Sequence, residues 1–276
     1  MHDEELVIKI PDEVEAIALC GGPYNNFSAV EAFLDETKGT AWRFCLGDLG
    51  GFGPYPDLTI DLIRKANIIC LQGNYDEAVS NSGEECGCGY LDPLDRKFAQ
   101  ISFDYTFTAT SEHHKTWMRS LPKHIFLNWR RKKILLCHGS PDQVNEFVFE
   151  SETKDKKIEN WLDTNNVDAI FATHSGLPWV RKVDNGYWVN VGVLGRPAHE
   201  GRSQVYYCML HHTMQDNNLR PELKRLNYDP LPVIKGMEDV GLPKEFSEAL
   251  LKGEWTTCYN ILPKAELPVR DRSSGT

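Results

Sequence analysis

Four apolar segments of the sequence are each followed directly by polar side chains of types that bind metal ions. These segments end in "CLGD" with Asp48, "LQGNYD" with Asn74 and Asp76, "LLCHG" with His138 and "FATHSG" with His174. A carboxylate, an amide oxygen and two imidazoles form a mixed nitrogen and oxygen set, which suits a divalent metal such as Mn, Zn, Fe or Ni. Each residue type is common at a strand end, so only the repetition indicates a shared site.

The apolar segments alternate with helical patterns in the first part of the chain. Strands are predicted at 14–20, 42–48 and 67–74, and helices at 27–39 and 56–66. This alternation predicts a parallel sheet with helices packed on it. Ligands of open α/β sheets bind beyond the carboxyl ends of the strands, so we expect Asp48, Asn74, His138 and His174 to meet at one edge.

The rest of the chain is predicted to form a single domain with the first part. Helices are predicted at 111–122 and 154–166, buried strands at 132–141 and 167–176, and antiparallel strands of a second sheet at 186–197 and 203–212. We expect one domain over 1–262, a less regular insert over about 77–110 and a disordered tail at 263–276.

Composition limits the kind of partner that the chain can bind. The net charge is −10, whereas binding an extended nucleic acid needs clustered Lys and Arg. The only dense basic run, "NWRRKKILL", is interpreted as a solvated turn before a strand. The sequence has neither an apolar run long enough to span a membrane nor a signal-peptide pattern at its start. We expect a cytoplasmic protein with a small substrate; whether it forms a homo-oligomer stays open.

Seven of the eight cysteines fall into two groups. Five lie inside apolar segments and are predicted to be buried free thiols: Cys20, Cys45, Cys70, Cys137 and Cys208. Cys86 and Cys88 instead form a C-x-C in the polar stretch "GEECGCGY". Two neighbouring thiols can bind a soft metal, but the spacing is not a standard zinc signature. A surface loop without a ligand role is the other interpretation.

The ordered series Gly-Asp, Gly-Asn-x-Asp, His-Gly and a late turn with a histidine resembles the calcineurin-like metallophosphoesterases, especially their small bacterial phosphodiesterase-like group. The likeness is close in "CLGDLGGFGPYPDLTIDLIR", "QGNYDEAV", "LLCHGSP" and "VNVGVLGRP", and it covers roughly residues 15–210. The resemblance implies a four-layer α/β/β/α sandwich with a metal centre at one edge. It also implies a metal-dependent phosphoric ester hydrolase.

The resemblance implies two metal half-sites, and only one of them matches. Its ligands, a bridging Asp, an Asn and two His, correspond to Asp48, Asn74, His138 and His174. This match implies a mononuclear centre, or a binuclear centre whose first metal has other ligands.

The other half-site lacks its family ligands. Gly22 and Tyr24 stand where the first turn carries Asp and His, and Gly176 stands where the late turn carries a second His. Tyr24, Cys86 and Cys88 are the candidates for replacement ligands. Alternatively, Tyr24 fills the vacated volume and hydrogen-bonds a phosphate oxygen, which we favour because a tyrosine with a pKa near 10 needs a strong Lewis acid to ionise.

The resemblance also assigns roles around the substrate. Tyr75 replaces a histidine that assists the leaving group, and Asp76 matches the residue that orients it. Tyrosine donates a proton less readily near neutral pH, so esters with good leaving groups or strained cyclic diesters are favoured. A guanidinium can bind phosphate through two hydrogen bonds. The predicted phosphate-binding residues are Arg196, Tyr24, Asn25 and Asn26.

Three functions remain open from the sequence. The first is a phosphodiesterase that acts on a small cytosolic substrate through one divalent ion. The second is a catalytically inactive module that binds a ligand or partner in the same pocket. The third is a different reaction at a single metal, with Cys86 and Cys88 as participants.

Overall fold

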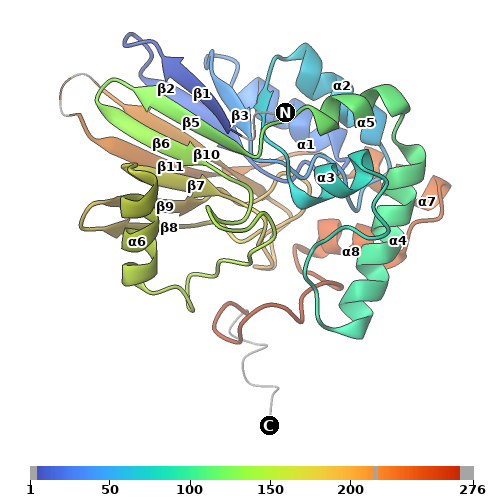
Figure 1. The fold of residues 1–276 in the computed structure, drawn as a ribbon. Coiled ribbons are helices and arrows are strands. Elements are labelled where there is room, and N and C mark those ends of the chain that lie inside the picture. Colours follow the sequence, from blue (N-terminus) through green and yellow to red (C-terminus); the bar gives the residue numbers. More distant parts are fainter. Residues whose placement is uncertain (1–4, 214, 216, 268–276) are drawn as a thin grey trace.

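Two β-sheets packed face to face form the centre of the molecule, and helices cover both outer faces (Figure 1). The computed structural model describes residues 5–213, 215 and 217–267. The layers are therefore helix, sheet, sheet and helix, which confirms the predicted four-layer α/β/β/α sandwich.

The smaller sheet contains the alternating elements that the sequence predicts. Its strand order is β11-β10-β2-β3-β4, in which β2 (Ala16–Cys20), β3 (Arg43–Cys45) and β4 (Ile69–Cys70) are parallel. The connecting helices are α1 (Phe27–Glu36) and α2 (Pro56–Lys65). On the other side of β2, β10 (Val205–His212) and β11 (Leu219–Leu226) are antiparallel.

The larger sheet has the order β1-β5-β6-β7-β9-β8. Its strands are β1 (Glu5–Ile10), β5 (His124–Trp129), β6 (Lys132–Leu136), β7 (Ala169–Ala172), β8 (Trp179–Val183) and β9 (Gly186–Asn190). The prediction that 186–197 and 203–212 form one second sheet is wrong, because β9 pairs with β7 and β8, whereas β10 pairs with β2 and β11. An apolar pattern identifies a strand but not its neighbour.

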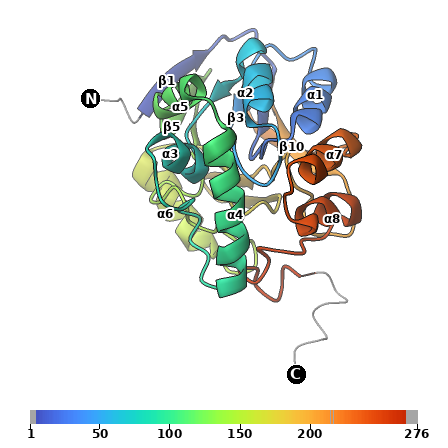
Figure 2. The same ribbon diagram turned by 90° about the vertical axis from the view of Figure 1, so that its right-hand side faces the viewer.

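Helices on the two faces have different partners. α6 (Asp155–Asn165) packs on the larger sheet, where Trp161 and Leu162 contact a buried cluster that includes Trp188. The other helices lie on the side of the smaller sheet (Figure 2): α3 (Asn74–Ser80), α4 (Pro93–Ala109), α5 (Glu112–Arg119), α7 (Leu231–Asp239) and α8 (Lys244–Lys252), together with α1 and α2.

The predicted insert is more regular than expected. Only its first part, residues 81–92, is irregular, and α4 follows with 17 residues. The Asp92 side chain accepts hydrogen bonds from the N–H groups of Leu94 and Asp95, and Pro93 occupies the first turn. Aromatic and β-branched residues in "FDYTFTA" weaken the local helical signal, which is why the pattern did not indicate a helix.

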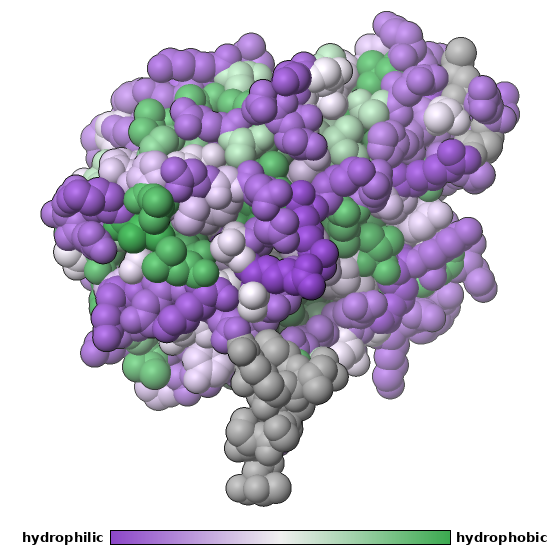
Figure 3. Space-filling model, turned by 180° about the vertical axis from the view of Figure 1, so that it is seen from behind, coloured by the Kyte–Doolittle hydropathy of each residue, from purple (hydrophilic) through white to green (hydrophobic). Residues whose placement is uncertain are grey.

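The two ends of the chain are described only in part. Of the predicted tail, 268–276 lies outside the described residues, while Glu266 accepts a 2.7 Å hydrogen bond from the Ser151 N–H. None of the described helices is long and apolar enough to cross a membrane. Hydrophobic groups on the face seen in Figure 3 are separated by hydrophilic ones.

The interface between the two sheets should dominate stability. Phe44 of β3 is fully buried there with Trp129 and Phe171. Phe44→Ala is expected to lower the free energy of unfolding by about 3–5 kcal/mol, because it removes apolar contacts and leaves a cavity. Urea unfolding measures the change. Leu58→Ala, at a side chain 44% exposed, should stay within about 0.5 kcal/mol of wild type; equal effects of the two substitutions would contradict the assignment of the core.

Candidate metal centre

Three side chains from the ends of three strands meet at one edge of the sandwich. His138 Nε2 lies 3.3 Å from Asp48 Oδ2 and 3.2 Å from His174 Nδ1. Asp48 follows β3, whereas His138 and His174 follow β6 and β7 of the other sheet. Asn74, the first residue of α3, follows β4 and is buried like the other three. The structure thus brings the four residues to one edge, and their role as metal ligands stays a prediction.

The spacing of these atoms fits a single metal ion. Two ligand atoms that are each about 2.0–2.2 Å from one ion lie about 3.0–3.5 Å apart, as His138 Nε2 does from Asp48 Oδ2 and from His174 Nδ1, and all three atoms lie within 4.8 Å of one another. Asn74 Oδ1 is buried and has no hydrogen-bond partner in the described part of the chain. Because an unpartnered buried polar atom costs free energy, such atoms indicate a missing partner.

The backbone fixes the orientation of His138. Its Nδ1 lies 2.6 Å from the Leu46 carbonyl oxygen, which can only accept a hydrogen bond. When the ring is neutral, Nδ1 therefore carries the proton and the Nε2 lone pair faces Asp48 and His174. A histidine held in this way by a carbonyl is typical of a metal ligand.

Burial and mutual charge set the protonation of the cluster. Burial alone would raise the pKa of Asp48 and lower that of His138, but the attraction between the two outweighs burial, so the pKa of Asp48 is lowered and that of His138 is raised. Burial, helped by the charge of His138, lowers the pKa of His174 to about 3. His174 is therefore neutral near pH 7 and keeps a lone pair for a metal.

Asp76 supports the centre from behind. Its carboxylate accepts hydrogen bonds from the N–H groups of Asp48 (2.8 Å), Leu49 (3.0 Å) and Gly73 (2.8 Å). Burial, and then the charge of Asp48, raises the pKa of Asp76 to about 7. Both oxygens are engaged by the backbone of the loops after β3 and β4. Asp76 therefore positions these loops, and the structure does not place it where it could orient a leaving-group donor.

The Tyr75 hydroxyl points away from the cluster. It donates to Ser102 Oγ at 2.9 Å and lies 3.3 Å from the Ala99 carbonyl oxygen, both on α4. Its backbone N–H donates to Asp48 Oδ1 at 3.0 Å. In this arrangement the ring fills the core under α4 and the backbone N–H reaches the centre, so the role of Tyr75 at a leaving group stays a prediction.

Asn25 and Asn26 hold local structure as well. The Asn25 amide nitrogen donates to the Gly53 carbonyl and to Thr106 Oγ1 of α4, each at 3.1 Å. The Asn26 side chain caps α1 by accepting a 3.1 Å hydrogen bond from the Ala29 N–H. The phosphate contacts of these two residues stay a prediction.

Aromatic rings occupy the volume of the missing half-site. A Cβ added at Gly22 would lie 2.8 Å from Tyr24 Cζ and 2.6 Å from Val193 Cγ1. A Cβ added at Gly176 would lie 3.2 Å from the indole of Trp255. The positions of the lost Asp and His therefore face the rings of Tyr24 and Trp255. This packing agrees with the interpretation that Tyr24 fills vacated volume.

A buried guanidinium lies beside these rings. Arg196 is 6% exposed and sits 4.2 Å from the ring centre of Trp255 and 5.0 Å from that of Phe52. It donates a hydrogen bond to the Thr257 carbonyl oxygen, and no carboxylate of the described residues lies within ion-pair distance. Arg196 lines a cavity of about 10 Å³ with Tyr24 and His174, room for about one water molecule.

The cysteines divide into the two groups that the sequence suggests, but the bond between Cys86 and Cys88 and their burial were not predicted. The five predicted buried thiols are buried and free, as is Cys258. Cys86 and Cys88 are joined in a disulfide, so in this state they offer no thiolate to a metal. They nevertheless lie against the centre, because Asn74 Nδ2 donates to the Cys86 carbonyl oxygen at 2.8 Å and lies 3.4 Å from Cys88 Sγ.

A second group of ligand-type side chains, Asp61, His113 and His114, does not fit a metal equally well. The Arg64 guanidinium lies 3.2 Å from His114 Nδ1 and can only donate. The proton of neutral His114 is therefore on Nε2, the nitrogen that faces Asp61 at 3.4 Å. With that proton in place, Nε2 cannot bind a cation.

The backbone around the centre adopts conformations that are rare for residues with a side chain. Tyr24, Asp48 and His174 have positive φ of 48°, 56° and 48°, each at a cost of about 1–3 kcal/mol. Gly73 allows the side chains of Asp48 and His138 to pack against its backbone, since a Cβ at this position would lie 2.3 Å from Asp48 Oδ1 and 2.9 Å from His138 Cε1. Such strain gathers at functional sites.

Several residues around the cavity were not singled out from the sequence. Tyr90 from the insert, Phe147 from the loop after β6, and Trp255 after α8 all line it. The Phe147 ring centre lies 4.4 Å from that of His174. These residues carry no motif, and only their positions in the fold reveal them. From the sequence alone, these three aromatic residues could not be distinguished from aromatic residues that only pack in the core.

The lowered pKa of His174 predicts a pH effect on the metal-free protein. Between about pH 6.5 and pH 3 the unfolded chain binds a proton at this residue that the folded state does not. Stability should therefore fall as pH decreases through this window, by up to about 1.4 kcal/mol per pH unit.

Urea unfolding at pH 7, 6 and 5 measures this slope. His174→Gln should reduce it, whereas His113→Gln, at an exposed position, should leave it unchanged. Identical slopes in wild type and His174→Gln would contradict the assignment.

Comparison with known proteins agrees with this fold. Residues 17–215 match the family model of the calcineurin-like phosphoesterase superfamily domain. The uncharacterized protein MJ0912 of Methanocaldococcus jannaschii is 27% identical over 256 residues, which is 86% of this chain and 98% of that protein.

Two solved structures share the architecture. A metallophosphoesterase from Sphaerobacter thermophilus has a TM-score of 0.67 at 21% identity, covering 87% of this chain and all of its own. The hypothetical protein PH1004 from Pyrococcus horikoshii has a TM-score of 0.72 at 18% identity, covering 86% of this chain and 98% of its own. The family model spans most of the chain, and we conclude that this protein belongs to the calcineurin-like phosphoesterase superfamily.

Proposed function

We propose that the protein is a metal-dependent phosphoesterase that hydrolyses a phosphodiester of a small molecule through one divalent ion. The observation that supports this most is the buried meeting of Asp48, His138 and His174 at distances that suit one ion. Asn74 supplies a fourth candidate ligand through its unpartnered Oδ1. A small phosphorylated substrate and a cytoplasmic location are further parts of the proposal.

The chain's own residues supply what surrounds the ion. A bound divalent cation would polarise a phosphoryl oxygen and lower the pKa of a water molecule. Asp48, His138, His174 and Asn74 would hold that cation beside the cavity, which His174 lines. Phe147 and Trp255 line this cavity, which has room for about one water molecule, so a phosphodiester would reach the ion only after these rings move aside.

Arg196 is proposed to replace the charge of the missing second cation. Its guanidinium lies beside the rings that occupy the vacated half-site, and no described carboxylate pairs with it. Burial lowers the pKa of Arg196, but an arginine remains protonated near pH 7. A cation held between two rings and left unpaired is suited to bind a phosphate oxygen.

The leaving group receives little help from the protein. Tyr75 and Asp76 are engaged by Ser102 and by backbone amides, and so provide no proton donor at the cluster. The Tyr24 ring lines the cavity, but burial and then Asp48 raise the pKa of its hydroxyl, which makes it a poor acid. We therefore propose a substrate with a good leaving group or a strained cyclic diester.

Hydrolysis of an aryl phosphodiester tests the proposal. Activity should require an added divalent metal such as Mn²⁺ or Zn²⁺, should exceed that on the matching aryl monoester, and should be lost in His138→Ala. His113→Ala, at an exposed position outside the centre, is the control and should keep wild-type activity.

Metal binding without turnover of any ester would contradict hydrolysis. It would favour the alternative of a binding module, which the small enclosed cavity and the engaged Tyr75 also suit.

Arg196 gives a second test of the same proposal. Arg196→Met should lower kcat on the aryl diester by about 10²–10³-fold, as loss of one charge-stabilising donor does. Arg225→Met, at an exposed arginine on β11, should have no effect. Mn²⁺ affinity, measured in parallel, should be unchanged in both variants. Wild-type kcat in a folded Arg196→Met protein would contradict the role of this guanidinium.

A further inference from the structure

The irregular loop 81–92 packs directly on the candidate metal centre. Asn74 Nδ2 donates to the Cys86 carbonyl oxygen at 2.8 Å, and Asn145 Nδ2 donates to the Gly87 carbonyl oxygen at 2.8 Å. An amide group has its nitrogen and oxygen on opposite sides, so the contact with Cys86 leaves Asn74 Oδ1 turned away from this carbonyl. That oxygen is buried and has no partner among the described residues. The loop therefore orients the candidate ligand.

The segment that orients Asn74 is closed by the Cys86–Cys88 disulfide. Cys88 Sγ lies 3.4 Å from Asn74 Nδ2, so both cysteines of the bridge contact the same amide. Gly87 has φ of 65° and open space around its Cβ position. Without the bridge, the hydrogen bond from Asn145 to the Gly87 carbonyl remains, but the glycine leaves the backbone torsions of the segment less restricted. The bridge thus restrains the carbonyl that holds Asn74.

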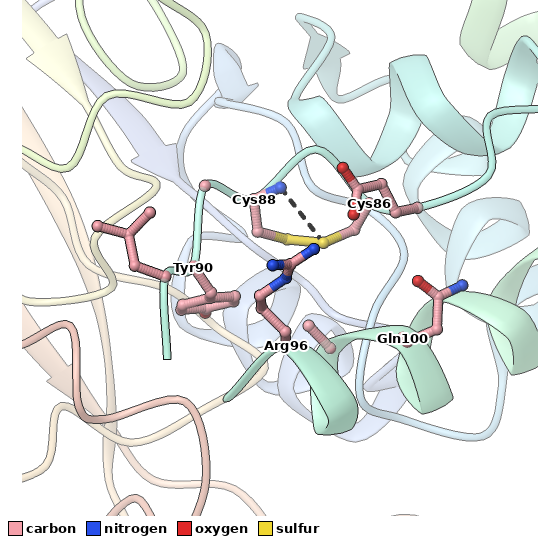
Figure 4. A pocket seen from close by; sticks show the side chains of 9 residues that line it. Cys86, Cys88, Tyr90, Arg96 and Gln100 are labelled. Carbon is pink, nitrogen blue, oxygen red and sulfur yellow. Dashed lines mark hydrogen bonds between the residues drawn. A yellow bond between two sulfur atoms is a disulfide. The ribbon is translucent and has the colours of Figure 1, made fainter. Parts of the chain in front are cut away.

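The other side of the disulfide faces a surface cavity of about 250 Å³ (Figure 4). Arg96 and Gln100 of α4 line this cavity together with Cys86 and Cys88, and the Arg96 guanidinium points toward the disulfide. The species that attacks a disulfide is a thiolate anion. A small thiol can therefore reach the sulfurs through this cavity, and Arg96 supplies a positive charge beside them.

We propose that Cys86–Cys88 is a reversible redox site that controls metal binding through the orientation of Asn74. A small dithiol reduces the bridge: the S–S bond breaks, two electrons and two protons pass to the cysteine sulfurs, and the dithiol closes into its own disulfide. A small disulfide reverses the exchange. The reduced loop releases Asn74 and weakens binding of the ion. This inference rests on the metal centre of the proposed function but not on hydrolysis.

Mn²⁺ binding to the full chain in its two redox forms tests the proposal. The protein is oxidised with a small disulfide or reduced with dithiothreitol, the reagent is removed without oxygen, and thiol alkylation with mass spectrometry verifies each form. Free Mn²⁺ is then counted by electron paramagnetic resonance. Reduction should weaken Mn²⁺ binding by about 10–100-fold, the usual effect of losing a partner that orients a ligand. Reoxidation should restore the affinity.

Variants show whether the effect passes through these residues. Cys86→Ser/Cys88→Ser should bind Mn²⁺ like the reduced protein under both conditions. Asn74→Ala should bind more weakly than the oxidised wild type and show no redox response. Cys208→Ala, which removes a buried thiol of β10 outside the bridge, should keep the full response.

Two results would overturn the redox site alone: equal Mn²⁺ affinity of the verified oxidised and reduced forms, or a pair that stays reduced after treatment with the disulfide. Absence of Mn²⁺ binding in every form would overturn the metal centre, and with it both the redox site and the proposed function. Because the measurement counts bound ions, a failure of hydrolysis would not affect it.

Discussion

Asp48, His138 and His174 are packed against one another where almost no solvent reaches, and the surrounding structure serves to hold them there. Burying ionisable groups is costly unless each finds a partner. The Leu46 carbonyl orients one imidazole, and the Asp76 carboxylate gathers the backbone amides of the two neighbouring loops. Asn74 Oδ1, which this arrangement leaves without a partner among the described residues, is an atom that the proposed cation would engage.

Where the family resemblance implies a second metal half-site, this protein has aromatic rings and a buried arginine instead. The rings of Tyr24 and Trp255 lie next to Gly22 and Gly176, the positions at which the family carries an Asp and a His. Arg196 is buried beside them, between the rings of Trp255 and Phe52. A fixed cation of the protein differs from a bound metal, because it contributes charge and hydrogen bonds but does not activate water. The site is therefore not simply an eroded copy of a two-metal centre.

The sequence predicted the convergence of the four strand-end residues because parallel strands bring their carboxyl ends to one edge. It could not predict where Tyr75 and Asp76 direct their polar atoms, since a matching position in a motif does not determine hydrogen-bond partners. For Asn26 the sequence did contain a signal, because an asparagine directly before a helix at Phe27 is typical of a cap. The contact of Cys86 with Asn74 depends on the path of an irregular loop, which no periodicity encodes.

The central claim is that one divalent ion binds among these side chains. A crystal grown with Mn²⁺ and measured at the manganese absorption edge tests it most directly. The account predicts one anomalous peak per chain, within about 2.0–2.3 Å of Asp48 Oδ2, His138 Nε2, a nitrogen of His174 and Asn74 Oδ1. No peak at this position, or a second peak of equal height beside the Tyr24 ring, would contradict it.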